Sequence, residues 1–370
     1  MNILGLYLKN FRNYKEISLK FNKNLNVIWG ENAQGKTNLL ESIYLCSIGK
    51  SFKPVTEKEM IFFGEKFLDV RVDYFSCGRE MYNTVRVYTE KKKSVTVNGV
   101  GLTKMSELVG NLNVVIFTPG ELALIKEGPG MRRRFIDMLI CQVKPGYMSI
   151  LSSYNKIIEQ KNKLLKEVQN KPSLEETLDV WDEQLSIYGA EIVFLRNKFL
   201  EQIMTIAKKY HLEISKEKEK ISAVIKSSSK ISGGNSKEEI QKMLLKSFHE
   251  NRKREIFVSS TVVGPHRDDI EFYINGNLAK IFGSQGQQRT FVLALKLAQK
   301  DLFYEETGEQ PVLLLDDITG ELDVSRRNYL FSKITDSQVF ITCTDTDLVP
   351  KSKNTSFFKV CDGKVILEGK

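Results

Sequence analysis

The 370-residue sequence predicts an α/β fold in which a parallel sheet is joined by an antiparallel β region and a long helical insert. Apolar runs at 25–29 and 312–315 are typical of parallel strands that are buried on both faces. Alternation between residues 68 and 97 instead indicates antiparallel strands. From about 130 to 250, apolar residues recur every three or four positions, as in helices. These periods predict a discontinuous α/β domain, 1–128 and 255–370, and a helical arm, 129–254.

A phosphate-binding loop is predicted directly after the first apolar run. The order G-x-x-x-x-G-K-T between a strand and a helix lets the backbone curl around a phosphate and aim unpaired N–H groups at it. Lys36 would reach the terminal phosphates and Thr37 would ligate Mg²⁺. The alternative, a glycine-containing turn before an ordinary helix, requires strand, spacing, lysine and threonine to coincide by chance. The predicted nucleotide contacts here are Gly30, Glu31, Asn32, Ala33, Gln34, Gly35, Lys36, Thr37 and Asn38.

Two carboxylates end the last apolar strand, as a triphosphate site with Mg²⁺ requires. We expect Asp316 to ligate the metal and Asp317 to orient the attacking water, so that Lys36, Asp316 and Asp317 form the catalytic set. A strand-terminal acidic turn without a catalytic role is the alternative.

A second helix start of the anion-binding kind lies far along the chain. Ser284-Gln285-Gly286-Gln287 leads into an apolar helix, where backbone N–H groups again face outwards. One chain thus carries two helix starts suited to phosphate.

Charge and composition limit the partners. A net charge of +9 allows a polyanion. Among three adjacent arginines at 132–134, at least one should be free for an external anion, although a solvated helix start paired with carboxylates explains them equally well. Between the strands expected within residues 1–29, Arg12 lies in a loop next to aromatic residues and could face a nucleotide base; an ordinary solvated loop is an equally good alternative.

Other patterns argue against membrane and metal roles. No apolar run approaches the length of a membrane span, and the start lacks the features of a signal peptide. The five cysteines lie apart, without metal-ligand spacing, which favours a reducing cytoplasm. His266, Asp268 and Asp269 could suggest a metal cluster, but His is a soft ligand beside Mg²⁺ chemistry.

Together these motifs resemble the ATP-binding-cassette (ABC) ATPases of the chromosome-maintenance branch, which includes the heads of SMC proteins and Rad50. The likeness covers essentially the whole chain. It rests on the motifs at 10–14, 30–37, 132–137, 181–182, 264–269, 284–290 and 314–323.

The resemblance adds roles that the residues alone do not. It makes Ser284, Gly286 and Gln287 part of a signature motif that contacts the γ-phosphate held by a second subunit, and it places Asp323 in a loop at that dimer interface. It also implies an ATP-dependent homodimer. Asp317 stands where most members have Glu, which is consistent with slow hydrolysis. Thr118 replaces a frequent Gln, and Cys343-Thr344 stands where transporters have a switch His.

By resemblance, ATP would close the dimer on double-stranded or gapped DNA, and weak, DNA-dependent hydrolysis would release it in recombinational repair. The implied partners are RecR and RecO, which help load the RecA recombinase. The alternatives are an SMC-type tethering ATPase, for which the insert is too short, and an ATP-gated scaffold without significant turnover. The candidate DNA contacts are Arg132, Arg133, Arg134, Arg252, Lys253 and Arg254.

Overall fold

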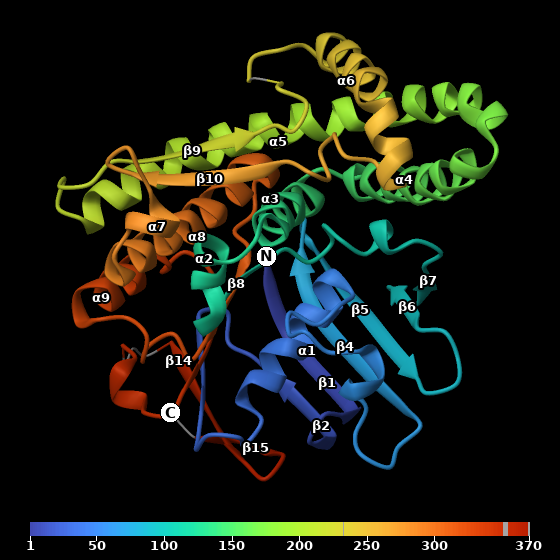
Figure 1. The fold of residues 1–370 in the computed structure, drawn as a ribbon. Helices are drawn as coiled ribbons and strands as arrows, with labels where there is room; N and C mark the ends of the chain where they lie inside the picture. Colours follow the sequence, from blue (N-terminus) through green and yellow to red (C-terminus); the bar gives the residue numbers. More distant parts are fainter. Residues whose placement is uncertain (232, 351–353, 369–370) are drawn as a thin grey trace. The chain divides into compact units, whose positions relative to one another are not determined.

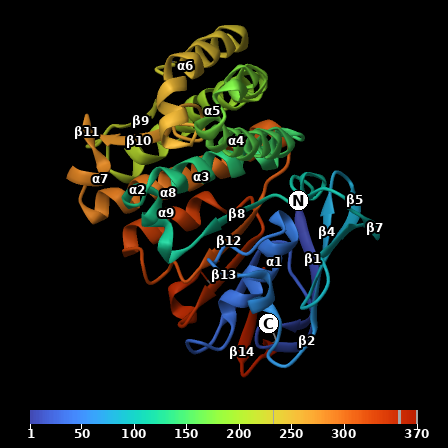
Figure 2. The same ribbon diagram turned by 45° about the vertical axis from the view of Figure 1, so that its right-hand side comes forward.

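The structure, a computed structural model, describes residues 1–231, 233–350 and 354–368 (Figures 1 and 2). The chain forms two compact units, one of Met1–Leu122 with Val292–Lys370 and one of Ala123–Phe291. We call them the sheet unit and the helical unit. The predicted α/β class, with an antiparallel sheet and long helices, is confirmed.

In the described part of the sheet unit, two six-stranded sheets contact helix α1 (Lys36–Ile48). The first has the order β2-β1-β4-β5-β6-β7 and is antiparallel. Its strands are β1 (Asn2–Phe11), β2 (Tyr14–Lys20), β4 (Phe67–Ser76), β5 (Arg79–Tyr88), β6 (Ser94–Val97) and β7 (Val100–Gly101).

The second sheet has the order β15-β14-β3-β13-β12-β8 and is parallel except for its β14–β15 edge pair. It brings the carboxyl ends of β3 and β12 to the same edge, which is where ligands bind in such sheets. The strands are β3 (Leu25–Trp29), β8 (Val114–Phe117), β12 (Val312–Asp316), β13 (Val339–Cys343), β14 (Thr355–Cys361) and β15 (Lys364–Glu368). The unit also contains α9 (Val324–Lys333), the later part of α8 (Gln285–Thr307), and the short helices η1 (Glu57–Met60), η2 (Met105–Glu107), η3 (Pro119–Leu122) and η5 (Thr346–Leu348).

The antiparallel sheet confirms one predicted face and corrects another. Alternate residues 68, 70, 72 and 74 of β4 are fully buried, as their pattern predicts. In β5 the looser alternation at 82, 84, 86 and 88 does not mark the buried face, because Met81, Asn83, Val85 and Val87 are all buried, whereas Thr84 alone is buried in the other set. Asn83 is buried because it donates a hydrogen bond to the Cys46 carbonyl and accepts one from Tyr74. Polarity therefore misled the interpretation of β5.

The helical unit is built on three long helices that pack against one another, α4 (Tyr147–Asn170), α5 (Leu178–Ile214) and α6 (Lys237–Val258) (Figures 1 and 2). The predicted α5 seam is confirmed at Leu185, Ile192, Phe199 and Ile203, which are buried. Shorter elements complete the unit: α2 (Ala123–Lys126), α3 (Pro129–Val143), η4 (Pro172–Thr177), α7 (Ala279–Phe282), and a sheet of order β11-β10-β9 formed by β9 (Ile221–Lys226), β10 (Asp269–Ile274) and β11 (Asn277–Leu278).

The sequence predicts that the α/β domain resumes at residue 255, but the first strand after the arm begins further along the chain. Residues 255–258 form the last turn of α6, and the next strand is β10, which starts at Asp269. Strand β9 lies inside the predicted arm and was missed, although Ile221, Ala223 and Ile225 alternate with more exposed residues. Because β10 pairs with β9, residues 255–291 group with the helices, whereas the predicted domain limit at 254/255 placed them with the α/β domain.

Candidate nucleotide site and a second helix start

The P-loop runs from the end of β3 to the start of α1, and two of its glycines are sterically required. Gly30 has φ +149°, and a Cβ there would overlap the Val360 carbonyl oxygen. Gly35 has φ +110°, and a Cβ there would overlap the Asn13 side chain. Between them, Glu31, Asn32 and Ala33 form an exposed turn. The tight turn after a strand therefore has the shape that the sequence motif predicts.

Two residues at the turn between β1 and β2 support the P-loop through hydrogen bonds. Asn13 Nδ2 donates to the Gln34 carbonyl at 2.8 Å, and Asn13 Oδ1 accepts from Asn38 Nδ2 at 2.9 Å. The Tyr14 hydroxyl donates to the Gly35 carbonyl at 3.0 Å. In the sequence, only Arg12 of this loop was a candidate contact. Asn13 and Tyr14 were missed as supports of the P-loop, because their hydrogen-bond partners lie more than twenty residues away in the chain.

Arg12 is fixed by protein contacts at the side of a cavity of about 600 Å³. Its guanidinium donates to both oxygens of Glu41, at 2.6 and 3.0 Å, and to the Glu59 carbonyl. Burial alone would raise the pKa of Glu41, but hydrogen bonds from Arg12 and Ser51 hold it below its ordinary value. Arg12 and Asn38 both line this cavity beside the P-loop, so Arg12 stays a predicted nucleotide contact.

Lys36 lies over the P-loop, where its hydrogen-bond partners among the described residues are two backbone carbonyls. Its Nζ donates to Gly30 O at 2.6 Å and to Glu31 O at 2.7 Å. Burial lowers the pKa of Lys36, against the opposing pull of Asp317 and Asp316. Both acceptors are neutral, and Lys36 forms no ion pair with a described carboxylate, which suits its ammonium group to a phosphate.

Thr37 and the end of β12 meet next to the loop. Thr37 Oγ1 donates to Asp316 Oδ1 at 2.7 Å, and Thr342 Oγ1 donates to the same oxygen at 2.8 Å. The Thr342 hydroxyl also accepts from the Asp317 backbone N–H at 2.8 Å. The structure thus brings together three of the predicted residues, Thr37, Asp316 and Asp317, and adds Thr342, which the sequence did not single out.

Asp317 differs from Asp316 in exposure and backbone conformation. Asp316 is buried, whereas Asp317 is exposed and has φ +48°. Burial of part of the carboxyl group raises the pKa of Asp317, while Lys36 opposes that rise. Its exposed carboxylate next to the P-loop is compatible with the predicted water-orienting role.

The second predicted helix start lies in the helical unit, where α8 begins. Ser284 is exposed; its backbone N–H donates to Gln287 Oε1 at 2.9 Å and its Oγ accepts from the Gln287 N–H at 3.2 Å. Gln287 also donates to Glu219 at 2.9 Å. This reciprocal cap holds Ser284 at the N-terminal end of the 23-residue helix α8, next to the half-buried Gly286.

The predicted DNA contacts separate into structural and exposed cations. Arg132 is 5% exposed, pairs with both oxygens of Asp269 at 2.7 and 3.0 Å, and donates to the Glu127 carbonyl at 2.6 Å. Arg132 therefore links α3 to β10, and we withdraw its assignment as a DNA contact. Arg252 is also engaged, by Asp179 and Asp182. Arg133 is half-buried and donates to the Asp268 carbonyl, whereas Arg134, Lys253 and Arg254 are exposed.

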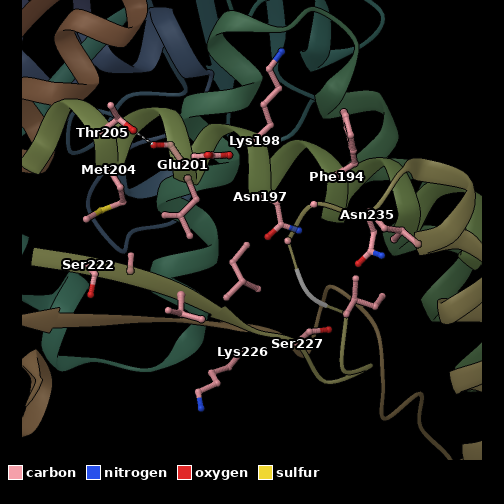
Figure 3. A pocket seen from close by; sticks show the side chains of 18 of the residues that line it. Phe194, Asn197, Lys198, Glu201, Met204, Thr205, Ser222, Lys226, Ser227 and Asn235 are labelled. Carbon is pink, nitrogen blue, oxygen red and sulfur yellow. Dashed lines mark hydrogen bonds between the residues drawn. The ribbon is translucent and has the colours of Figure 1, made fainter. Parts of the chain in front are cut away.

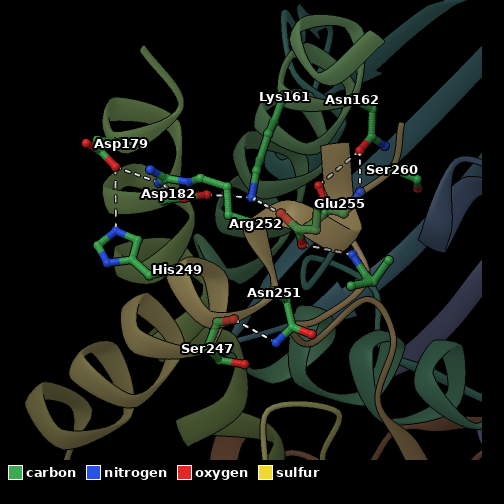
Figure 4. Close-up of polar contacts among 12 residues, drawn as sticks. Lys161, Asn162, Asp179, Asp182, Ser247, His249, Asn251, Arg252, Glu255 and Ser260 are labelled. Atoms are coloured by element: carbon green, nitrogen blue, oxygen red, sulfur yellow. Dashed lines mark hydrogen bonds and ion pairs between the residues drawn. The ribbon is translucent and has the colours of Figure 1, made fainter. Parts of the chain in front are cut away.

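The three residues of the possible metal cluster point to separate partners. His266 contacts the Tyr154 hydroxyl at 3.0 Å, Asp268 accepts from Ser228, and Asp269 binds Arg132. Among the described residues the three do not form a group that could hold an ion. Figure 4 shows another polar cluster, in which Arg252 lies between Asp179 and Asp182 and Lys161 contacts Glu255.

The fold and the P-loop define a P-loop ATPase head of the ABC and SMC class. The chain matches the RecF/RecN/SMC N terminal domain family over residues 2–365. It is 42% identical over 348 residues to the DNA replication and repair protein RecF of Acetivibrio thermocellus, with 94% of each chain covered. The chain belongs to the RecF family of DNA replication and repair proteins.

Further relatives support this assignment. RecF of Alkaliphilus oremlandii is 42% identical over 367 residues, covering 99% of this chain and all of that one. A solved structure described as the recombination mediator protein RecF with ATP in the RecFOR pathway is 36% identical, with a TM-score of 0.94 over 100% of this chain and 98% of that chain. An SMC head bound to a winged-helix domain of ScpA, at 16% identity and a TM-score of 0.59 over 100% of this chain and 98% of that chain, shares the fold. The predicted family is thus confirmed. Separately, no helix in the described ranges is long and apolar enough to cross a membrane.

Proposed function

We propose that this chain is an ATP-dependent DNA-binding protein of cytoplasmic recombinational repair, which dimerises on ATP and is reset by weak hydrolysis. The observation that carries the proposal is the convergence of Lys36, Thr37 and Asp316 at one loop, with Thr37 Oγ1 only 2.7 Å from Asp316 Oδ1. The solved relative described with ATP supports the choice of nucleotide.

The oxygen donors of this site fit Mg²⁺. The Thr37 hydroxyl and the Asp316 carboxylate are hard ligands of the type that Mg²⁺ prefers, and Asp316 is oriented by Thr342. When bound, the metal would neutralise phosphate charge. Lys36 would contact the terminal phosphates, and the Asp317 carboxylate would orient water and accept its proton.

A second copy would complete the site. Ser284 and Gly286 lie at the start of a long helix, where backbone N–H groups and the helix dipole favour an anion. We assign Ser284, Gly286 and Gln287 to the γ-phosphate of the nucleotide in the opposite subunit. ATP then stabilises the dimer by binding it better than the monomers, and hydrolysis removes that stabilisation.

The closed dimer would bind the backbone of double-stranded or gapped DNA through exposed cations. Arg134, Lys253 and Arg254 are the candidates on the described surface, with Arg133 as a half-buried neighbour. Phosphate contacts position a protein without reading bases, so binding would respond to DNA structure more than to sequence. The RecFOR pathway given for the solved relatives supports RecR and RecO as partners, with RecA loaded downstream.

An ATP-gated scaffold without significant turnover is the second candidate, and Asp317 favours it. Its side chain is one methylene shorter than the Glu expected there, and its backbone lies in the left-handed region. Phosphate release by the DNA-bound dimer distinguishes the two functions. Release on the timescale of dimer dissociation supports the hydrolytic cycle, and dissociation without release supports the scaffold.

The decisive experiment is the molecular mass in solution with and without ATP and Mg²⁺. We expect a monomer without nucleotide and a dimer with it. Ser284→Arg should remain monomeric with ATP while retaining nucleotide binding, because its own P-loop is intact. Ser152→Arg, at an exposed serine of α4, is the matched control and should dimerise. A dimer that forms without nucleotide, or a Ser284→Arg protein that dimerises normally, would contradict the composite site.

A further inference from the structure

A groove of about 850 Å³ lies in the helical unit between α5 and β9 (Figure 3). In the described sheet, β9 pairs with β10 on one side and with no strand on the other. Every residue from Ser222 to Ser227 lines the groove, whereas no residue of β10 does. Since side chains alternate between the faces of a strand, lining by consecutive residues shows that the groove follows the free edge of β9.

The opposite wall is one face of α5. Its lining residues are spaced by three and four, the repeat of a single helix face: Phe194, Asn197, Lys198, Leu200, Glu201, Met204, Thr205 and Lys208. The fifteen residues of helix from Phe194 to Lys208 span about 22 Å, and six extended residues span about 20 Å. Helix face and free edge therefore match in length, and the groove has room along one complete short strand.

The walls combine apolar area with positive charge. Phe194, Met204 and Ile225 line the groove with apolar side chains. Lysines 198, 208, 226 and 230 line it, against a single acidic residue, Glu201. Lys226 is 3.6 Å from Glu271, but across the described residues no carboxylate pairs with Lys198, Lys208 or Lys230. An occupant with carboxylates would thus meet unpaired ammonium groups.

We propose that this groove binds an extended, acidic segment of a partner protein, which adds a strand to the free edge of β9. Main-chain hydrogen bonds from the edge supply affinity, and alternate side chains enter the apolar part of the groove. The lysines select acidic sequences by charge complementarity. A nucleic acid would use the lysines but not the strand edge or the apolar wall. This inference does not depend on ATP binding or on dimerisation.

The test uses the full chain and a fluorescein-labelled hexapeptide of alternating valine and glutamate, followed by fluorescence anisotropy. We expect saturable binding, weakened about tenfold or more by Lys208→Glu with Lys230→Glu. The matched control, Lys163→Glu with Lys209→Glu, changes the net charge equally at exposed lysines outside the groove, and should keep the Kd within about twofold.

Backbone pairing has its own readout. N-methylation of the peptide at alternate residues removes the N–H groups on one edge only, so one set of methylated positions should abolish binding and the interleaved set should preserve it. Absence of peptide binding, equal effects of the two methylation patterns, or equal losses in the two charge-reversed proteins would overturn the proposal. If a short DNA duplex displaces the peptide, and this displacement is weakened by the changes at Lys208 and Lys230 but not by those at Lys163 and Lys209, the groove would be assigned to nucleic acid instead.

Discussion

Lys36 and Lys161 are both buried lysines, but their surroundings differ in kind. Lys36, in the sheet unit, is 7% exposed and has two backbone carbonyls as its hydrogen-bond partners. Lys161, in the helical unit, is 1% exposed and contacts Asp182 at 2.5 Å and Glu255 at 2.6 Å (Figure 4). Both carboxylates are themselves buried.

The difference separates a binding lysine from a structural one. Carbonyl partners orient an ammonium group without neutralising it, so Lys36 retains its charge for a phosphate. Two carboxylates compensate Lys161 completely, and its removal would leave negative charge in the interior. Burial alone thus does not reveal the role of a lysine, whereas the formal charge of its partners does.

The largest effect should follow from Lys161→Met. The substitution keeps the side-chain volume but removes the ion pair of Glu255 and leaves Asp182 with Arg252 as its remaining cation, which should cost about 3–5 kcal/mol of the stability of the helical unit. Urea unfolding of a Trp29→Phe background, in which Trp181 of α5 is the remaining tryptophan, measures that unit selectively.

Two further measurements sharpen the comparison. Lys163→Met, at an exposed lysine on the same helix, should change stability by less than about 0.5 kcal/mol. ATP binding by the Lys161→Met protein should be unchanged wherever the fold persists. A Lys161→Met protein as stable as its control would show that the buried network contributes nothing.

A smaller effect is expected from Lys36→Met, and it should appear in ATP affinity instead of in the free energy of unfolding. No buried carboxylate loses a partner, so the unfolding free energy should stay within about 1 kcal/mol of the original value. Affinity for ATP should fall about a hundredfold, equivalent to about 2.7 kcal/mol, because the uncompensated ammonium group is lost. Titration with a fluorescent ATP analogue measures the loss, and Lys20→Met at an exposed lysine is the control. Retained affinity would mean that the carbonyl-held lysine does not contact phosphate.

Sequence reasoning located Lys36 but not Lys161, and the reason is physical. The P-loop is a local motif, so strand, glycines, lysine and helix start are all visible within a dozen residues. The partners of Lys161 come from two other helices, and the ion-pair partner of Arg132 comes from a strand 137 residues away. Asn98-Gly99 and Asn275-Gly276 are turn signals of the same local kind, and each connects two paired antiparallel strands in the structure.

Errors arose where a tertiary contact outweighed the local pattern. In β5 the polar Asn83 is buried by a hydrogen bond to α1, which reversed the apparent face of the strand. At the end of α6, Phe257 and Val258 resemble a strand, yet they lie in the last helical turn and are exposed. Arg132 is a surface residue by type, but Asp269 and the Glu127 carbonyl, which follows α2, hold it in the interior.

The smallest effect extends the comparison to His266, a half-buried group that forms no ion pair with a described carboxylate. His266 lies against the Tyr154 hydroxyl and the Thr261 carbonyl. Burial lowers its pKa from 6.5 to about 4, and the nearby cations Arg267, Arg133 and Lys161 act in the same direction. Between these values the unfolded chain binds a proton that the folded chain does not, so stability present above pH 6.5 is lost as the pH falls towards 4.

His266→Gln should therefore reduce the acid dependence of the helical unit. We expect the difference in unfolding free energy between pH 7 and pH 4 to shrink by about 2 kcal/mol, measured through Trp181 in the Trp29→Phe background. His249→Gln, at an exposed histidine, is the control and should keep the full difference. If both variants retain the same acid dependence, protonation of His266 is not what destabilises this unit in acid, and the carboxylates around Lys161 become its source.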